Sequence, residues 1–259
     1  MSTSPAFSLA RRLRAGETVH SGWCGLPYPI VAELVGREGF PAVTLDGQHG
    51  LWDISATLTA IANVRLAGAA PIVRIPVGEF ATVSRALDFG AEGIIAPMIN
   101  TVTDARAYVS FAKFPPIGER SWGPHRATTL ANMPDQKVYL REANELTVAF
   151  AMIETQTALN NCEAIAATPG IDGLFLGPAD LSIALSNGAN VDPMAGEVDR
   201  EIDRITAAAH KSGKIMGAYC HNAERAVALA KRGVRFLAVG SDMGFLRAGA
   251  AAALKALKG

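Results

Sequence analysis

The stretch GLFLGPADLS, residues 173–182, decides the fold prediction. Its apolar run is short enough for a buried strand, and Gly177 and Pro178 then end that strand. Asp180 follows at once and precedes a segment with helical character. The stretch therefore predicts a buried strand, a turn and a helix, with a carboxylate at the carboxyl end of the strand.

The same pattern recurs along the whole chain. Short apolar or β-branched runs alternate with segments of helical spacing, most of which end at glycine. Strands are predicted at 18–25, 41–46, 70–76, 92–99, 146–154, 172–178, 213–220 and 235–242. Near-continuous apolar strands are typical of a parallel sheet covered on both faces. Repeated strand–helix units on a chain of about 250 residues predict an α/β fold, a (β/α)₈ TIM barrel, as one domain over residues 1–259.

A doubly wound sheet uses the same alternation and is the alternative fold. It normally carries a glycine-rich phosphate turn, and neither GWCGLPYP (22–29) nor LDGQHG (45–50) matches that pattern. Residues 116–146 are too long and too polar for an ordinary connection. We interpret them as an insertion between a strand and the following helix, which in a barrel is often functional.

Composition and charge argue against several classes of protein. Lys plus Arg and Asp plus Glu each total 24, so no basic excess is available for nucleic acid or a membrane surface. The chain shows neither a secretory signal nor an apolar run of membrane-spanning length, so we expect a cytoplasmic protein. Cys24, Cys162 and Cys220 lie outside any C-x-x-C pair, which argues against a disulfide framework and a thiolate zinc site.

Chemistry in a barrel lies at the carboxyl ends of the strands. The polar residues at these positions are Asp46 and His49 after the second strand, Arg74 in the third, Glu154 after the fifth, Asp180 after the sixth and Asp242 after the eighth. We therefore expect all of them at one mouth. Lysines lie elsewhere, so carbanion chemistry here has to use a metal rather than a Schiff base.

Glu154 and Asp180 follow neighbouring strands, so their carboxylates can converge. Such a hard, oxygen-rich site suits Mg²⁺ or Mn²⁺. The alternative is that each acid caps the helix that follows it. Arg74 lies in an apolar strand and needs a partner, either an anionic substrate or a carboxylate such as Glu154 or Asp46. His49 suits proton transfer near neutral pH, with Asp46 to fix its tautomer, or is structural.

Several segments together resemble the HpcH/HpaI aldolase family of metal-dependent pyruvate aldolases. They are VTLDGQHG, PIVRIP, ALDFGAEGIIAPMINTVTDA, FPPIGERSWG, AMIET and GIDGLFLGPADLS. The resemblance extends from about Leu9 to the last helix. The combination of Glu-Thr with Gly-Pro-Ala-Asp-Leu-Ser is specific, whereas the other segments alone are weak signals.

The resemblance implies a divalent ion, Mg²⁺ or Mn²⁺ with Co²⁺ as a further candidate, held by Glu154 and Asp180. It also implies a 2-oxo acid whose carboxylate is bound near Gly177, Pro178, Ala179 and Asp180. Arg74 matches the arginine that stabilises the enolate oxygen. In the same way, His49 matches the proton carrier, with Asp46 as its support.

Three further features follow from the resemblance. Trp23 matches a tryptophan that lines the substrate pocket. Asp88 matches an aspartate that reaches the site of a neighbouring subunit. The family forms homo-hexamers in which the last helix packs on another subunit.

The implied activity is a reversible aldol reaction between a pyruvate-type 2-oxo acid and an aldehyde, with oxaloacetate decarboxylation as a side activity. Gln48, Met152, Ser121 and Trp122 depart from the usual family residues, which leaves the donor open between pyruvate and hydroxypyruvate. One alternative is a CoA-thioester lyase of the citrate lyase beta-subunit type, for which Arg120 and Arg126 would bind phosphate. The other is a non-enzymatic ligand-binding barrel whose acids are helix caps.

Overall fold

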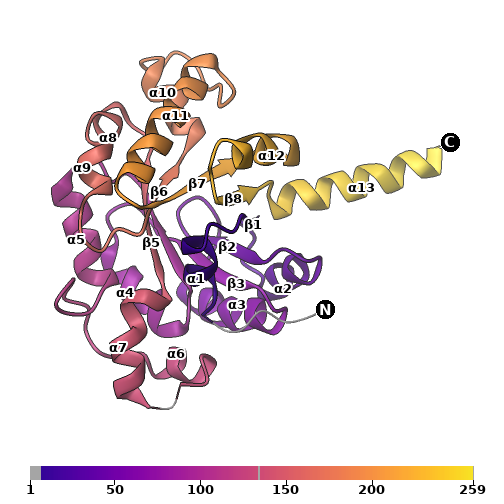
Figure 1. The fold of residues 1–259 in the computed structure, drawn as a ribbon. Coiled ribbons are helices and arrows are strands. Elements are labelled where there is room, and N and C mark those ends of the chain that lie inside the picture. Colours follow the sequence, from indigo (N-terminus) through magenta and orange to yellow (C-terminus); the bar gives the residue numbers. More distant parts are fainter. Residues whose placement is uncertain (1–6, 134, 259) are drawn as a thin grey trace.

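A computed structural model describes residues 7–133 and 135–258 (Figure 1). Eight parallel strands close into a barrel in chain order, which confirms the predicted (β/α)₈ fold and excludes the open doubly wound sheet. The strands are β1 (Val19–Cys24), β2 (Ala42–Asp46), β3 (Ala70–Arg74), β4 (Gly93–Ala96), β5 (Val148–Ile153), β6 (Gly173–Leu176), β7 (Ile215–Cys220) and β8 (Phe236–Val239). Each lies inside one of the segments predicted from the sequence.

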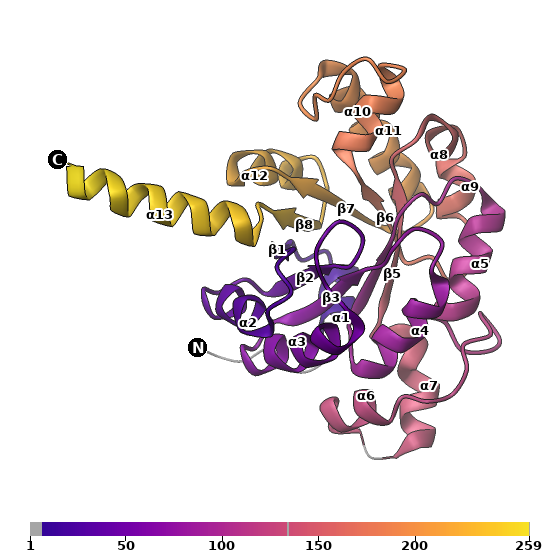
Figure 2. The same cartoon turned by 180° about the vertical axis from the view of Figure 1, so that it is seen from behind.

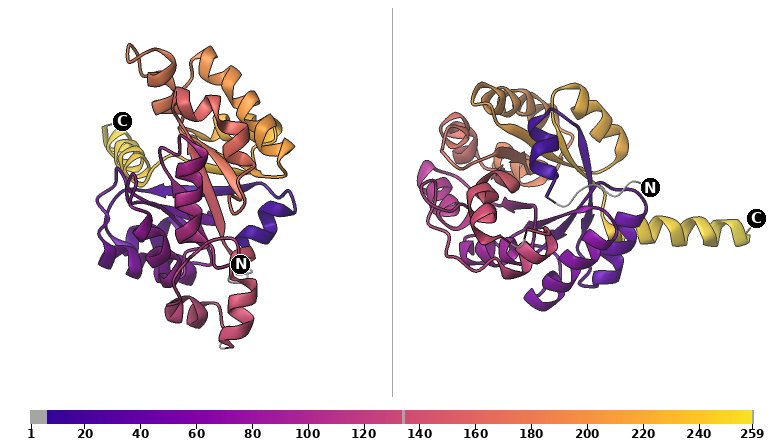
Figure 3. Two further views of the ribbon diagram at one scale, coloured as in Figure 1. Left: turned by 90° about the vertical axis from the view of Figure 1, so that its left-hand side faces the viewer. Right: turned by 60° about the horizontal axis from the view of Figure 1, so that its bottom comes forward.

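Helices surround the barrel, as the end-on view in Figure 3 shows. They are α1 (Leu9–Arg14), α2 (Pro29–Arg37), α3 (Ile54–Leu66), α4 (Phe80–Phe89), α5 (Val102–Ala112), α6 (His125–Leu130), α7 (Gln136–Leu146), α8 (Gln156–Asn160), α9 (Cys162–Ala166), α10 (Pro178–Leu185), α11 (Gly196–Lys211), α12 (Ala223–Lys231) and α13 (Asp242–Lys258). In the described part of the chain, none of them has the length and apolar character to cross a membrane.

Large side chains fill the barrel interior. Phe150, Phe175 and Phe236 come from three strands, and their ring centroids lie 5.1 to 6.2 Å apart. Helix α1 closes the amino end, where Leu9 and Leu13 are buried against the same cluster. The interior is therefore a packed core, as is usual for this fold, and a ligand has to bind at one of its ends.

The long connection lies at the amino end of the barrel, and its expected position between a strand and a helix is wrong. It follows helix α5 and precedes strand β5, so it lies opposite the mouth. It contains α6, which contacts α4, and α7, which contacts α1 (Figure 1). Phe7, Phe114 and Tyr139 form a small apolar cluster beneath it. In a barrel this end serves stability rather than chemistry.

Helix α13 extends away from the barrel, which is plain both in Figure 1 and from behind in Figure 2. Asp242 at its start is buried, and its carboxylate accepts the backbone N–H groups of Gly25 and Leu26 at 3.0 and 2.9 Å. These bonds join the last helix to the loop after β1. The rest of the helix is exposed.

Candidate active site

A cavity of about 220 Å³ opens at the carboxyl ends of the strands. It is lined by Trp23, His49, Arg74, Met152, Glu154, Phe175, Gly177, Pro178, Ala179, Asp180 and Tyr219. The structure thus brings together most of the residues that the sequence singled out. Asp46 lies directly behind the lining, in contact with Arg74 and Trp23.

Arg74 and Asp46 form a bidentate ion pair at the base of the cavity. Strands β2 and β3 are in register so that the two residues are direct neighbours. Arg74 donates from Nε and Nη2 to the two carboxylate oxygens at 2.8 and 2.6 Å, and both residues are buried. Burial alone would raise the pKa of Asp46, but the hydrogen bonds and charge of Arg74 outweigh it and lower that pKa. The expected partners of Arg74 were an anionic substrate or a carboxylate such as Glu154 or Asp46, and the structure shows Asp46.

Trp23 holds the other side of this pair. Its indole Nε1 donates to Asp46 Oδ2 at 3.1 Å, and the Arg74 guanidinium lies 4.8 Å from the centre of the indole ring. The guanidinium plane is therefore fixed by two neighbours. The Arg74 side chain has further N–H groups, and it lines the cavity.

His49 is exposed at the rim of the cavity. The expectation that Asp46 orients its imidazole is wrong for the described chain. Asp46 Oδ1 instead accepts the backbone N–H groups of Gln48 and His49, at 3.1 and 3.2 Å. Asp46 thus shapes the turn that carries His49, and the imidazole itself faces solvent at the mouth.

Glu154 is a buried carboxylate with one unpaired oxygen. Its Oε1 accepts the backbone N–H of Met98 at 2.8 Å, from a loop in which Met98 has a φ of 54°, in the left-handed region that non-glycine residues seldom adopt. Its Oε2 is buried and has no hydrogen-bond partner. Burial, with a smaller contribution from the charge of Asp180, raises the pKa of Glu154 to about 7.

Helix α10 begins beside this carboxylate. Pro178 is its first residue, so the N–H groups of Ala179 and Asp180 are in the first turn, where a helix has no internal partner for them. Asp180 is the third residue of this helix, and its N-cap position is Gly177, which has no side chain. A side-chain carbon at Gly177 would overlap Glu154 Oε2 and would approach Met152 Cε to 2.9 Å. The absence of a side chain at Gly177 therefore lets the Glu154 carboxylate lie close to the backbone at Gly177.

These features fit a hard divalent cation. A buried carboxylate oxygen without a partner is costly unless a cation or a donor is bound to it. Among the described residues, no group of three or more His, Cys, Asp or Glu could hold a metal. Glu154 and Asp180 would therefore be the protein ligands, and water and substrate oxygens would complete the octahedron that Mg²⁺ and Mn²⁺ prefer.

Asp88 is not part of this cavity. It lies near the end of α4, at the amino end of the barrel, and pairs with Arg120 at 2.6 Å. Arg120 is buried, whereas Arg126 is exposed and lines a different cavity at the amino end. Neither arginine is near the mouth.

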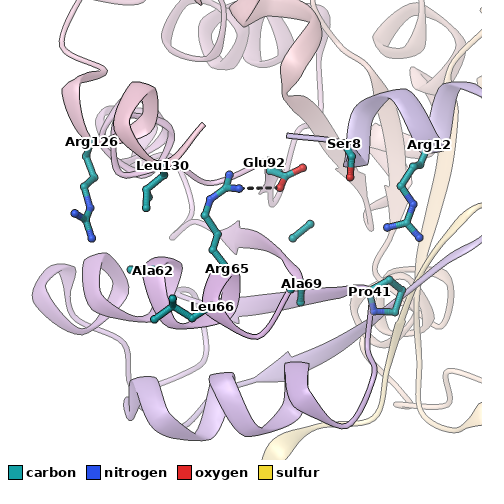
Figure 4. A pocket seen from close by; sticks show the side chains of 12 residues that line it. Ser8, Arg12, Pro41, Ala62, Arg65, Leu66, Ala69, Glu92, Arg126 and Leu130 are labelled. Atoms are coloured by element: carbon teal, nitrogen blue, oxygen red, sulfur yellow. Dashed lines mark ion pairs between the residues drawn. The ribbon is translucent and has the colours of Figure 1, made fainter. Parts of the chain in front are cut away.

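That second cavity, of about 350 Å³, lies at the amino end between α1, α3 and α6 (Figure 4). At its centre, buried Glu92 pairs with Arg65 at 3.2 Å and accepts the backbone N–H of Leu9 at 2.9 Å. Figure 4 shows Arg126 and Arg12 on opposite sides of the opening. The Glu92 carboxylate already has these partners. Among the described residues of this cavity, it is therefore not an unpaired carboxylate like Glu154.

Sequence reasoning missed three contributors to the mouth. Phe175 and Tyr219 belong to apolar strands, and Met98 acts through its backbone. The strand-end rule could have found Tyr219, which is the penultimate residue of β7. No residue type predicts the N–H of Met98, because it depends on the backbone conformation of the loop.

The barrel and its acidic mouth define an enzyme class, the (β/α)₈ enzymes that bind small substrates at the carboxyl ends of their strands. The chain belongs to the HpcH/HpaI aldolase/citrate lyase family, whose model matches residues 22–248. It is therefore an enzyme, a lyase of this family, and the family resemblance seen in the sequence is confirmed.

Similar proteins extend this result over nearly the whole chain. A hydroxypyruvate/pyruvate aldolase from Rhizorhabdus wittichii is 36% identical over 91% of this chain and 92% of its own length. A 5-keto-4-deoxy-D-glucarate aldolase from Klebsiella pneumoniae is 35% identical over 87% of this chain and 86% of its own. A crystal structure of a family member from Burkholderia cenocepacia superposes with a TM-score of 0.88 at 29% identity, covering 98% of this chain and all of that one.

Proposed function

We propose that the protein catalyses a reversible, divalent-metal-dependent aldol reaction between a pyruvate-type 2-oxo acid and an aldehyde. One observation carries the proposal: the buried, unpaired Oε2 of Glu154, a residue that lines the same cavity as Asp180. The names of the Rhizorhabdus and Klebsiella relatives support an aldolase. Oxaloacetate decarboxylation is expected as a side activity, because it passes through the same enolate.

The metal is Mg²⁺ or Mn²⁺ in this proposal, with Co²⁺ as a further candidate, held by Glu154 and Asp180. When bound, such an ion supplies positive charge to the carboxylate and keto oxygens of the 2-oxo acid as a Lewis acid. Glu154 has to be ionised to serve as a ligand. The hydrogen bond from Met98 keeps one of its oxygens in place, and the other has no hydrogen-bond partner in the described chain.

The protein's own groups bind and orient the substrate. The N–H groups of Ala179 and Asp180, at the start of α10, would bind the substrate carboxylate, with Gly177 and Pro178 next to them in the cavity wall. Arg74 would place its fixed positive charge at the oxygen where the enolate charge develops. His49, exposed at the rim, would carry protons to and from the aldehyde side of the reaction.

The assembly is a homo-hexamer in this proposal, with α13 packed on a second copy of the chain. Leu246, Leu254 and Leu257 are exposed on α13, with relative exposures of 66%, 53% and 85%. Between α13 and α2 lies an almost wholly apolar cavity of about 440 Å³. Exposed apolar surface of this kind is typical of an interface. Asp88 would act on a neighbouring subunit's site.

The remaining expectations stay proposals as well. Residues 1–259 act as one barrel domain, and the substrates are small molecules, with no nucleic-acid or membrane partner. A cytoplasmic location is consistent with Cys24, Cys162 and Cys220, which are buried free thiols.

Two alternatives are less well supported. A CoA-thioester lyase would need basic groups at the mouth for phosphates, and Arg120 and Arg126 lie at the other end of the barrel. A non-enzymatic barrel would use its acids as helix caps. Glu154 instead accepts from a loop, and Asp180 lies inside the first turn of α10 rather than at its N-cap, Gly177.

The proposal is tested by following pyruvate release from oxaloacetate, with EDTA and after adding back Mg²⁺ or Mn²⁺. Release that stops with EDTA and returns with metal supports it, and metal-independent release or none contradicts it. Glu154→Gln should abolish release. Glu163→Gln, which changes an exposed glutamate on α9, is the matched control and should leave release unchanged.

A further inference from the structure

Tyr219 lies in the mouth and lines the same cavity as Glu154 and Asp180. Its ring meets that of Trp23 edge-on, with centroids 5.4 Å apart, and meets that of His221 at 5.1 Å and 84°. Aromatic contacts of this geometry are favourable and restrict the ring. The phenol is therefore held in one place on the wall of the cavity.

The Tyr219 hydroxyl is available to a ligand. By contrast, Trp23 Nε1 and two nitrogens of Arg74 are engaged, since all three donate to Asp46. The described residues form no hydrogen bond with the Tyr219 hydroxyl. Burial raises the pKa of this phenol. The hydroxyl is thus neutral near pH 7 and can both donate and accept a hydrogen bond.

The cavity has a charged side and an aromatic side. Glu154 and Asp180, which follow β5 and β6, form the charged side, and Arg74 at the end of β3 lies between the two sides, with its guanidinium 4.8 Å from the centre of the Trp23 ring. The aromatic side consists of Trp23, Phe175 and Tyr219, with Trp23 and Phe175 stacked at 6.3 Å. Within this aromatic side, the Tyr219 hydroxyl is the polar atom without a protein partner in the described chain.

This division orients a 2-oxo acid, provided that the proposed function is correct. Its carboxylate and keto oxygens are drawn to the charged side, so its third carbon, which becomes the nucleophile, faces the aromatic side. A methyl group there cannot form a hydrogen bond with that hydroxyl. A hydroxymethyl group can instead form a hydrogen bond with that hydroxyl.

We infer that Tyr219 determines the donor: its hydroxyl binds a hydroxyl group on the third carbon, so the site prefers a 3-hydroxy-2-oxo acid such as hydroxypyruvate over pyruvate. Tyr219 is a specificity-determining residue in this view. It takes no part in the bond-forming step, which both donors share.

The test compares kcat/KM for hydroxypyruvate and for pyruvate, with one aldehyde, in the wild type and in Tyr219→Phe, both loaded with Mn²⁺. The ring and its contacts stay, and only the hydroxyl is lost. We expect kcat/KM for hydroxypyruvate to fall about tenfold, the usual worth of one buried hydrogen bond, and kcat/KM for pyruvate to stay within about twofold. Dissociation constants of the two donors, measured by calorimetry without aldehyde, should shift in the same ratio.

Tyr139→Phe is the matched control, because Tyr139 is a buried tyrosine at the amino end of the barrel. It should leave the donor ratio unchanged. An equal loss for both donors in Tyr219→Phe, or no loss for either, would overturn the inference while the aldolase proposal stands. A wild type that is inactive with both donors and with oxaloacetate would overturn the proposed function, and this inference with it.

Discussion

The Cα of Gly177 faces Glu154 Oε2 so closely that a single added side-chain carbon would overlap that oxygen. The same carbon would lie 2.9 Å from Met152 Cε and 3.1 Å from Glu154 Cβ. Because both neighbours are buried, neither can move aside freely. The absence of a side chain at Gly177 is therefore needed for the Glu154 carboxylate to keep this position.

Gly177→Ala should weaken metal binding much more than it weakens folding. We expect the dissociation constant for Mn²⁺, measured by calorimetry, to rise about tenfold or more, because the added carbon displaces the Glu154 carboxylate. Gly249→Ala is the control. Gly249 lies in exposed α13 with nothing within 4 Å of the added carbon, so this change should leave Mn²⁺ binding unchanged. Equal Mn²⁺ affinities in both variants would disprove the role of Gly177.

Glu154 should make the metal-free protein less stable as the pH rises. Its pKa is about 7 in the fold and near 4.5 when exposed, so the folded state binds the extra proton between these values. The free energy of unfolding therefore falls from pH 4.5 to 7 and levels off above pH 7. The two pKa values correspond to a loss of up to about 3 kcal/mol.

The measurement is urea unfolding in EDTA across this pH range, for the wild type and Glu154→Gln. The variant has no titrating group at this position, so the difference between the two curves isolates Glu154. Saturating Mn²⁺ should cancel the fall, since a bound cation favours the ionised form. A difference curve that is flat in EDTA would mean that the carboxyl group is not desolvated as the structure indicates.

The Arg74–Asp46 pair should be needed for both stability and activity, and a double variant separates the two. Asp46→Asn leaves a buried guanidinium without its counter-charge and should lower the free energy of unfolding by about 3 kcal/mol. Arg74→Lys loses the bidentate geometry and should lower kcat for oxaloacetate decarboxylation about a hundredfold. Arg74→Met with Asp46→Leu should recover stability but no activity. If the double variant is active, Arg74 is structural only.

The strands could be predicted because their signals are local. Short apolar or β-branched runs mark the buried strands, and all eight strands lie within the predicted segments. The connection at 116–146 shows where this kind of reasoning fails. Its length and polarity suggest a loop at the mouth, but its position after α5 places it at the amino end, and the structure follows the position.

From the sequence, only the charged residues of the site could be predicted. The strand-end rule finds Asp46, Arg74, Glu154 and Asp180, because charged side chains are conspicuous at the ends of apolar runs. The contact of Asp46 with the backbone of the His49 turn, rather than with the imidazole, depends on the conformation of that turn. Tyr219 has a mainly apolar side chain, so it gives no distinct signal within an apolar strand.

Lys113 illustrates a buried charge whose role is structural. It is almost fully buried and donates to Asp172 at 2.6 Å and to the carbonyls of Asn144 and Thr147 at 2.7 and 3.1 Å. Lys113→Met leaves these acceptors with fewer donors and should lower the free energy of unfolding by about 3 kcal/mol, with kcat unchanged at low temperature. The matched change at exposed Lys211 should leave the urea midpoint unchanged. Equal midpoints for both variants would contradict this account.

His49 should matter more for aldol cleavage than for decarboxylation. The two reactions share the enolate, but cleavage also removes a proton from the hydroxyl group that becomes the aldehyde, whereas loss of CO₂ from oxaloacetate needs no such base. His49→Ala should therefore lower kcat for aldol cleavage about a hundredfold and kcat for decarboxylation by less than about fivefold. Because Asp46 contacts the backbone and not the ring, Asp46→Asn should not reproduce this selective loss, and should affect both reactions together through Arg74. Equal losses in the two reactions for His49→Ala would instead assign it a role in binding, and unchanged rates would remove it from the mechanism.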